Sequence, residues 1–463
     1  MDFSPLSKQD ILEMLKTIGV DSIEDLFRDI PKSIRNPLLG IGNGNSELET
    51  RLILEDLASK NTVYTSYFRG AGMYNHYIPP VVNQIINRNE FYTAYTPYQP
   101  EVSQGYLQAI FEYQTAICNL TGMYATNASV YDGANALVEA AIMSKNITRR
   151  NSFLIIGELN PEYYRVFKTY GFSCEFQILS TNLENYKEML QLGEYAAVVI
   201  QNPTFFGNLQ DLENICKTVK EISPKTLIIE VIIESTSLGL LKKPASFGVD
   251  IVCGEGQPLG IPMSFGGPSL GFLATTKQHY RKLSGRIVGE TTEIDGKKKG
   301  YLLTLQAREQ HIRREKALSN ICSNQALCGL AIIVYLTAMG YKGLRKVAEL
   351  NVKNAYYLKS QLKDLPGIEV LNGNTPTFNE FLISVPTGFN EHLEKICIQN
   401  HLLPPYLLEK DTLEITREMS MYDFKNERDY LLTCVTEMNR AEHIQEFIQI
   451  FKQAMQLNGG SPK

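Results

Sequence analysis

Three stretches of the sequence gather side chains that can bind or activate a polar ligand. The first, FRGAGMYNHYIPP at residues 68–80, sets His76 and two tyrosines beside a proline-stiffened turn. The second, YTPYQPEVSQG at residues 95–105, concentrates hydroxyl, amide and carboxylate groups where prolines oppose regular helix. We expect the second stretch to line an active site rather than form an ordinary turn. His76 is a candidate for the same mouth, although a lone histidine is more often a packing residue. The candidate residues are Tyr95, Tyr98, Gln99, Glu101, Ser103 and His76.

The third stretch, NASVYDGANA at residues 127–136, runs into an alanine-rich segment that we expect to be helical. A small-residue turn at a helix N-terminus presents free backbone amides and the positive end of the helix dipole, which suit a phosphate group. A plain helix cap with tight packing explains the same residues. Both interpretations stay open for Asp132, Gly133 and Asn135.

Two further segments carry unusual composition. Residues 249–276 indicate a strand, a glycine-rich loop and a second strand, and the loop contains no lysine. The basic segment REQHIRREK at residues 308–316 predicts a helix start with Arg308, His311 and Glu315 on one face. For that segment we favour a structural or interface role over direct catalysis.

The composition excludes several classes of function. The chain has 463 residues, 44% of them hydrophobic, and a net charge of −5, which argues against a nucleic-acid or anionic-membrane surface. It contains no phosphate-binding P-loop, HExxH or GxSxG motif, and its eight cysteines and six histidines show no metal-ligand spacing. With no apolar run of membrane-spanning length and no signal-peptide pattern, we expect a cytoplasmic protein.

The coarse pattern predicts an α/β fold in two domains. From residue 152 onward, β-branched runs alternate with amphipathic helices, which indicates βαβ units around a mostly parallel sheet. A long helix is expected over residues 330–352, followed by strands at 379–385, 412–416 and 430–438. We therefore predict a helical arm (1–70), a large domain with the parallel sheet (71–330) and a smaller C-terminal α/β domain (331–463).

Together these stretches resemble the glycine cleavage system P-protein, a glycine decarboxylase of the fold-type I pyridoxal-phosphate class. Within that family the chain is similar to subunit 1 of the two-subunit bacterial form, from near residue 40 to near residue 440. The most specific carriers are GAGMYNHYIPP, YTPYQPEVSQG, NASVYDGANA, GEGQPLGIPMSFGGPSLGF and REQHIRREKALSNICSNQAL. The resemblance implies an aspartate-aminotransferase-like fold for the large and small domains.

The resemblance also implies that this chain lacks the covalent anchor for pyridoxal phosphate. In this class the cofactor aldehyde forms a Schiff base with a lysine. Aligning the lysine-bearing half of the family on Ile261-Pro262 and Gly266-Gly267 places Gln257 at the lysine position, and a glutamine amide cannot form that bond. Pyridoxal phosphate would then be held by subunit 2, and Asp132, Gly133 and Asn135 would be either a relic phosphate cup or an ordinary helix cap.

The implied reaction is the decarboxylation of glycine, with transfer of the aminomethyl group to the lipoyl arm of H-protein. The loop residues from Tyr95 to Ser103 would complete the partner's active site across the interface. Four residues depart from the family pattern, as expected of a half that does not hold the cofactor: Glu234 for aspartate, Asn135 for threonine, Asn160 for histidine and Arg69 for an apolar residue. Two alternatives stay open: a scaffold without active-site residues, or a self-sufficient enzyme that uses another lysine, such as Lys277.

Overall fold

The computed structural model describes residues 5–35, 40, 42–317 and 319–458, and these divide into two compact units. The first unit, within residues 1–62, contains two capped helices and two short 3-10 turns. In both helices a serine caps the first turn and an acidic side chain three residues later returns the bond, at Ser7 with Asp10 and at Ser46 with Glu49. Its elements are α1 (Lys8–Ile18), η1 (Ile23–Phe27), η2 (Lys32–Ile34) and α2 (Glu47–Ser59).

The second unit, residues 63–463, is built on a seven-stranded sheet with the order β4-β3-β5-β6-β7-β8-β2. Neighbours from β4 to β7 are parallel, whereas β8 runs antiparallel to both β7 and β2. The central strands are continuous apolar runs because both of their faces are buried. The strands are β2 (Ala125–Thr126), β3 (Ser152–Ile156), β4 (Gln177–Thr181), β5 (Ala197–Gln201), β6 (Leu227–Ile232), β7 (Ile251–Glu255) and β8 (Gly271–Thr275). The mostly parallel sheet predicted from the sequence is confirmed.

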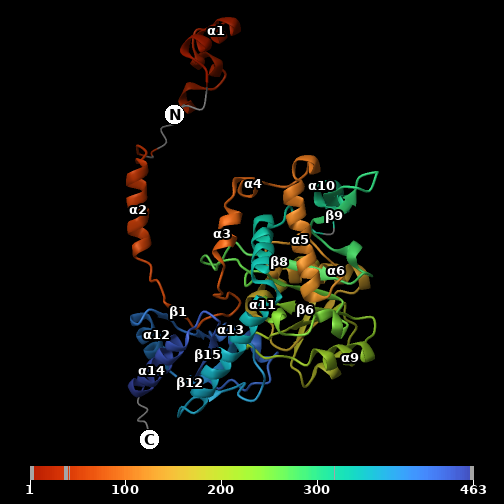
Figure 1. Cartoon of the computed structure of the whole chain (residues 1–463), viewed down its shortest axis with the longest axis vertical. Helices are drawn as coiled ribbons and strands as arrows, with labels where there is room; N and C mark the ends of the chain where they lie inside the picture. Colours follow the sequence, from red (N-terminus) through yellow and green to blue (C-terminus); the bar gives the residue numbers. More distant parts are fainter. Residues whose placement is uncertain (1–4, 36–39, 41, 318, 459–463) are drawn as a thin grey trace. The chain divides into compact units, whose positions relative to one another are not determined.

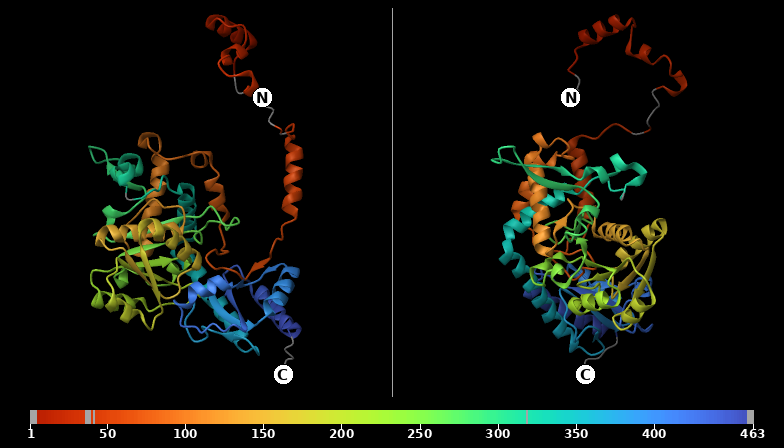
Figure 2. Two further views of the ribbon diagram at one scale, coloured as in Figure 1. Left: turned by 180° about the vertical axis from the view of Figure 1, so that it is seen from behind. Right: turned by 90° about the vertical axis from the view of Figure 1, so that its right-hand side faces the viewer.

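Helices cover both faces of this sheet (Figure 2). Alternate strand residues point to opposite sides, so Phe153 and Ile155 pack with α6 and α7 while Leu154 and Ile156 pack with the other helices. One face carries α6 (Gly133–Thr148) and α7 (Pro161–Cys174), and the other carries α5 (Gln104–Thr121), α8 (Tyr186–Leu192), α9 (Leu212–Ile222) and the first half of α11 (Ala326–Lys363). The site described below lies where the parallel strands end.

The C-terminal part forms a separate four-stranded antiparallel sheet, order β11-β12-β15-β14, backed by α12, α14 and the end of α11 (Figure 1). Its elements are β11 (Glu369–Val370), β12 (Glu380–Pro386), α12 (Phe389–Gln399), β13 (Leu402–Leu403), β14 (Tyr406–Leu407), α13 (Lys410–Arg417), β15 (Arg428–Cys434) and α14 (Ala441–Leu457). The short strand β1 (Ser66–Tyr67) pairs with β13 and ties the start of this unit to its C-terminal part. The predicted boundaries at residues 70 and 330 stay predictions.

Two predicted elements are wrong. Residues 412–416 are not a strand but lie in α13, where Thr412 and Thr416 are buried together at helical spacing. The predicted helix start over residues 308–316 is broken into the turns η7 (Gln306–Arg308), α10 (Gln310–Arg313) and η8 (Arg314–Lys316). The helix cannot continue because Arg314 has φ of 52°, so Arg308, His311 and Glu315 do not share a helical face.

Among the described residues, only α11 is long and apolar enough by composition to cross a membrane. Its first half packs instead on the sheet and on α5, burying Leu330, Ile332 and Tyr335. The helix bends at Gly340, where φ is 60°, and its second half packs in the C-terminal part. α11 therefore joins both parts of the unit.

Candidate functional site

The candidate site lies at the carboxyl ends of β6 and β7, the edge where ligands bind in parallel sheets. Gln257 lies two residues after the end of β7 and is only 2% exposed. Its Oε1 accepts a hydrogen bond from the Tyr74 backbone amide at 3.0 Å, and its Nε2 donates to the carbonyl oxygens of Tyr74 at 3.0 Å and Ile261 at 2.8 Å. The side chain at the expected lysine position is therefore a neutral amide with all its bonds made internally.

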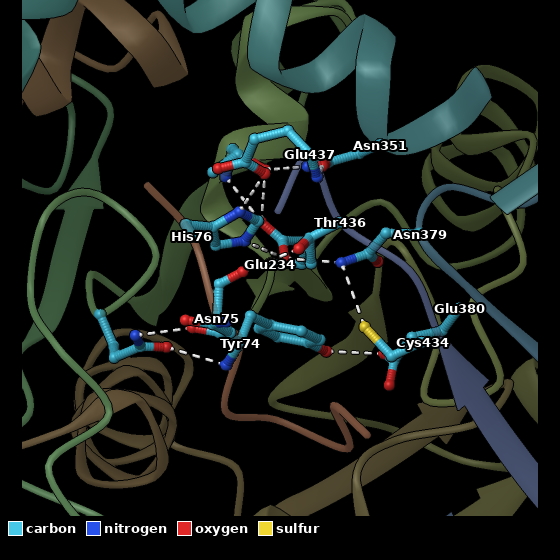
Figure 3. Close-up of polar contacts among 12 residues, drawn as sticks. Tyr74, Asn75, His76, Glu234, Asn351, Asn379, Glu380, Cys434, Thr436 and Glu437 are labelled. Carbon is cyan, nitrogen blue, oxygen red and sulfur yellow. Dashed lines mark hydrogen bonds and ion pairs between the residues drawn. The ribbon is translucent and has the colours of Figure 1, made fainter. Parts of the chain in front are cut away.

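A histidine held between two carboxylates follows two residues after Tyr74, the backbone partner of Gln257 (Figure 3). His76 Nε2 lies 2.9 Å from Glu234 Oε2, which follows β6, and His76 Nδ1 lies 2.8 Å from Glu437 Oε2, which follows β15. Burial lowers the pKa of His76, but the charges and hydrogen bonds of the two glutamates outweigh burial and raise this pKa to about 10. His76 is thus an imidazolium inside the protein, and its partners are not residues of the 95–103 loop.

The same network continues to the C-terminal sheet. Asn379 Nδ2 donates to Glu234 Oε2 at 2.8 Å, and the Tyr74 hydroxyl donates to Glu380 Oε2 at 2.7 Å (Figure 3). Burial raises the pKa of Glu380 to about 7. Glu234 Oε1 also accepts from the backbone amide and hydroxyl of Thr236, so both oxygens of Glu234 are occupied.

The start of α6 is closed by carboxylates of the chain itself. Asp132 is the N-cap, and its Oδ1 accepts from the Asn135 backbone amide at 2.7 Å. The Gly133 amide donates at 3.0 Å to Glu255 Oε2, whose pKa is raised by burial. The Tyr163 hydroxyl also crowds this turn, because a Cβ added at Gly133 would lie 2.1 Å from it. Two amides that a phosphate would use are therefore taken, one by Asp132 and one by Glu255.

The residues at this edge do not fit pyridoxal phosphate. The cofactor needs a lysine, a free carboxylate for its ring nitrogen and free amides for its phosphate. Here Gln257 at the expected lysine position is an amide, Glu234 is saturated by His76, Asn379 and Thr236, and Glu255 occupies the start of α6. The alternative lysine, Lys277, is exposed and follows Thr275, which pairs with Ile251 at the opposite end of β7. Lys277 therefore lies at the wrong edge of the sheet.

The 95–103 loop forms a second, exposed part of the candidate site. Tyr95 is 77% exposed and Tyr98 54% exposed, and Gln99 and Glu101 are also exposed. Tyr95 and Ser103 line one shallow cleft, and the Tyr98 ring meets His311 edge-on with 6.3 Å between ring centroids. The structure therefore groups the loop residues with one another and with His311, while His76 and Gln257 belong to the buried network.

Sequence reasoning missed several residues that build these regions: Glu255, Arg286, Glu380 and Glu437. Glu255 could have been found from the sequence, because an acidic side chain at the end of an apolar strand needs buried hydrogen-bond donors. The departures Asn160 and Arg69 are structural, because Asn160 caps α7 and Arg69 Nε donates to the Pro404 carbonyl. Both side chains therefore form hydrogen bonds with the backbone of the chain itself.

The fold is the one that fold-type I pyridoxal-phosphate-dependent enzymes share. Two such neighbours share the fold at low identity: a Lactobacillus brevis glutamate decarboxylase (TM-score 0.66, 14% identity, 92% of this chain and 96% of that chain) and a Nostoc alanine–glyoxylate aminotransferase (TM-score 0.57, 16% identity, 85% and 96%).

Closer similarity narrows the class to one family. The family described as glycine cleavage system P-protein matches residues 1–451. A "probable glycine dehydrogenase (decarboxylating) subunit 1" of Desulfitobacterium hafniense is 45% identical over 462 residues, covering 97% of this chain and 98% of that protein. The like-named protein of Desulforamulus reducens is 47% identical over 409 residues, covering 85% and 90%. A crystal structure of inhibitor-bound glycine decarboxylase (P-protein) of the glycine cleavage system has TM-score 0.86 and 38% identity, covering 98% of this chain and 100% of that one. The chain belongs to the glycine cleavage system P-protein family.

Proposed function

We propose that this chain is the subunit of a glycine decarboxylase that does not hold the cofactor, and that it completes an active site on a second subunit. The carrying observation is the buried Gln257, which has internal partners for its whole amide where a lysine is required. The relatives' name, subunit 1, supports a complex with a second subunit, and in this proposal that second subunit holds pyridoxal phosphate covalently. The glycine substrate, the lipoylated H-protein as acceptor and a cytoplasmic location belong to the same proposal.

The exposed loop supplies the groups that act across the interface. Tyr98 offers a hydroxyl, Gln99 an amide and Glu101 a carboxylate, which together can orient an ammonium-carboxylate substrate or the lipoamide arm. Tyr95 and Ser103 line the cleft beside them. The role of this chain is to bind and orient, while pyridoxal phosphate on the partner supplies the electron sink for loss of carbon dioxide.

The first experiment locates the cofactor. The chain alone and its complex with subunit 2 are incubated with pyridoxal phosphate, reduced with borohydride and mapped by mass spectrometry. The proposal expects no labelled lysine in the chain alone and label only on the partner in the complex. A labelled lysine in this chain, Lys277 included, would overturn it.

A second experiment separates shared catalysis from a purely structural scaffold. The double variant Tyr98→Phe, Glu101→Gln is compared with Tyr356→Phe, Glu188→Gln, which changes the same residue types at exposed positions on α11 and α8. Shared catalysis predicts an intact complex with glycine decarboxylation lowered at least tenfold in the loop variant only. Unchanged turnover in the loop variant would favour the scaffold.

A further inference from the structure

One buried arginine holds the exposed loop to the body of the protein. Arg286 is 4% exposed and precedes β9 (Ile287–Thr292) of the β9–β10 hairpin, in which β10 is Lys299–Thr304. Its Nη1 donates to the hydroxyl of Thr96 at 2.6 Å, and its Nη2 donates to the hydroxyl of Tyr98 at 2.8 Å. The guanidinium carbon also lies 5.0 Å from the centre of the Tyr98 ring.

The other donors of the same guanidinium reach the segment that precedes α11. Nη1 lies 3.2 Å from the Ser323 hydroxyl and Nη2 lies 3.0 Å from the Cys322 carbonyl oxygen. On the remaining side, Nε lies 3.8 Å from Glu309 Oε2, which balances the buried charge. A planar guanidinium can serve these directions at once, whereas a lysine ammonium offers three donors from a single atom.

The arginine stands on a fixed base. The Arg286 carbonyl oxygen accepts a hydrogen bond from the Ala128 amide at 2.7 Å. Two residues later, the Val288 backbone amide donates to Oε1 of Gln114, a buried side chain of α5, and the Val288 carbonyl oxygen accepts from Nε2 of the same side chain. The loop lies near the start of α5, as do β9 and α10 (Figure 1). By contrast, the backbone bonds within the loop are local, such as Tyr98 to Thr96 and Ser103 to Pro100. The loop therefore takes its orientation from side-chain bonds.

We infer that Arg286 is a positioning residue that sets the Tyr98 hydroxyl and the rest of the 95–103 loop for the partner's active site. This inference rests on the proposed function, because it assigns Arg286 a role through Tyr98. The role assigned to Arg286 is indirect, through the Tyr98 side chain. It fixes one rotamer of Tyr98 and one path of the loop, which a catalytic constellation built on an exposed segment requires.

The test uses the complex of this chain with subunit 2, loaded with pyridoxal phosphate. Arg286→Lys keeps the charge but not the fork, and the matched control is Arg281→Lys, an exposed arginine five residues earlier. Glycine decarboxylation is measured with lipoylated H-protein, and hydrogen–deuterium exchange is followed in peptides covering residues 92–103. We expect Arg286→Lys to lower kcat/KM about 10- to 100-fold and to speed exchange in these peptides, with cofactor content unchanged. Rates and exchange within twofold of wild type would overturn the inference.

A double-mutant cycle separates this inference from the proposed function. Because Arg286 acts through the Tyr98 hydroxyl, adding Arg286→Lys to Tyr98→Phe should lower kcat/KM by less than the single change does. Effects that multiply would overturn the positioning role. If Tyr98→Phe, Glu101→Gln leaves turnover unchanged, the proposed function itself fails. If Arg286→Lys does not assemble, Thr96→Val removes one acceptor without touching the arginine, and unchanged exchange in that variant would also overturn the inference.

Discussion

The imidazolium of His76 should contribute a large, pH-dependent part of the stability. His76→Gln removes the charge that lies between Glu234 and Glu437 and leaves two carboxylates buried with one neutral amide. A pKa of about 10 in place of 6.5 corresponds to about 5 kcal/mol. Removing one partner of a buried ion pair costs about 3–5 kcal/mol, so the two magnitudes agree.

The sign of the pH dependence follows from the raised pKa. Because the folded state binds this proton more tightly than the unfolded chain, the stabilisation is complete below pH 6.5, declines as the pH rises and is lost above about pH 10. The loss of stability in His76→Gln should therefore be largest near pH 6 and small near pH 10.5.

Urea unfolding followed by far-ultraviolet circular dichroism measures this effect, since the chain contains no tryptophan for fluorescence. The control is His392→Gln on α12, a half-buried histidine outside the network. The reasoning is refuted if His76→Gln and His392→Gln unfold at the same urea concentration at pH 6.5. It is equally refuted if the deficit of His76→Gln does not shrink between pH 6.5 and 10.5.

Three further predictions concern the buried sheet and the filled cofactor position. Glu230 lies in the centre of β6, and burial raises its pKa from 4.5 to about 8. The free energy of unfolding therefore falls as the pH rises from 4.5 to 8, because the unfolded chain loses this proton first. Glu230→Gln should raise the melting temperature at pH 8.5 and change it little at pH 5. Gly133→Ala should destabilise the fold by about 2 kcal/mol or more, since its Cβ meets the Tyr163 hydroxyl, and Tyr163→Phe in the same chain should restore part of the loss in chemical denaturation. Gln257→Lys should give no cofactor absorbance band when pyridoxal phosphate is added to the chain alone, because Glu255 and the His76 network still fill the site; a stable band that borohydride fixes on the new lysine would contradict the description of a filled site.

The central sheet could be predicted from the sequence because each strand is an uninterrupted apolar run flanked by amphipathic helices. Short amphipathic segments were harder. Residues 412–416 contain two β-branched threonines and an isoleucine, which favour a strand, yet packing of the C-terminal part selected a helix. The turn at Arg314 could not be predicted, because no glycine or asparagine marks it in the sequence. The positive φ of this arginine is set by tertiary contacts.

The candidate site was predictable only in its local parts. The roles predicted for Gln257, from motifs near it in the chain, and for the loop, from its composition, stay predictions. The environment of His76 could not be predicted, because Glu234 and Glu437 are 158 and 361 residues away in the sequence. Arg286 was missed for the same reason, since its partners Thr96 and Tyr98 are 190 and 188 residues away.

The separation in the sequence between His76 and its two glutamate partners also orders events during synthesis. The strands from β3 to β8 all lie before residue 280 in the sequence. The parallel sheet can therefore assemble while the rest of the chain is still being made. Until residue 437 emerges, His76 has one carboxylate, and until β15 emerges, β12 lacks the neighbour that pairs with all seven of its residues. The nascent chain therefore holds an unfinished interior until residues 428–437 are made, and chains cut short before them should be the ones that chaperones and proteases remove.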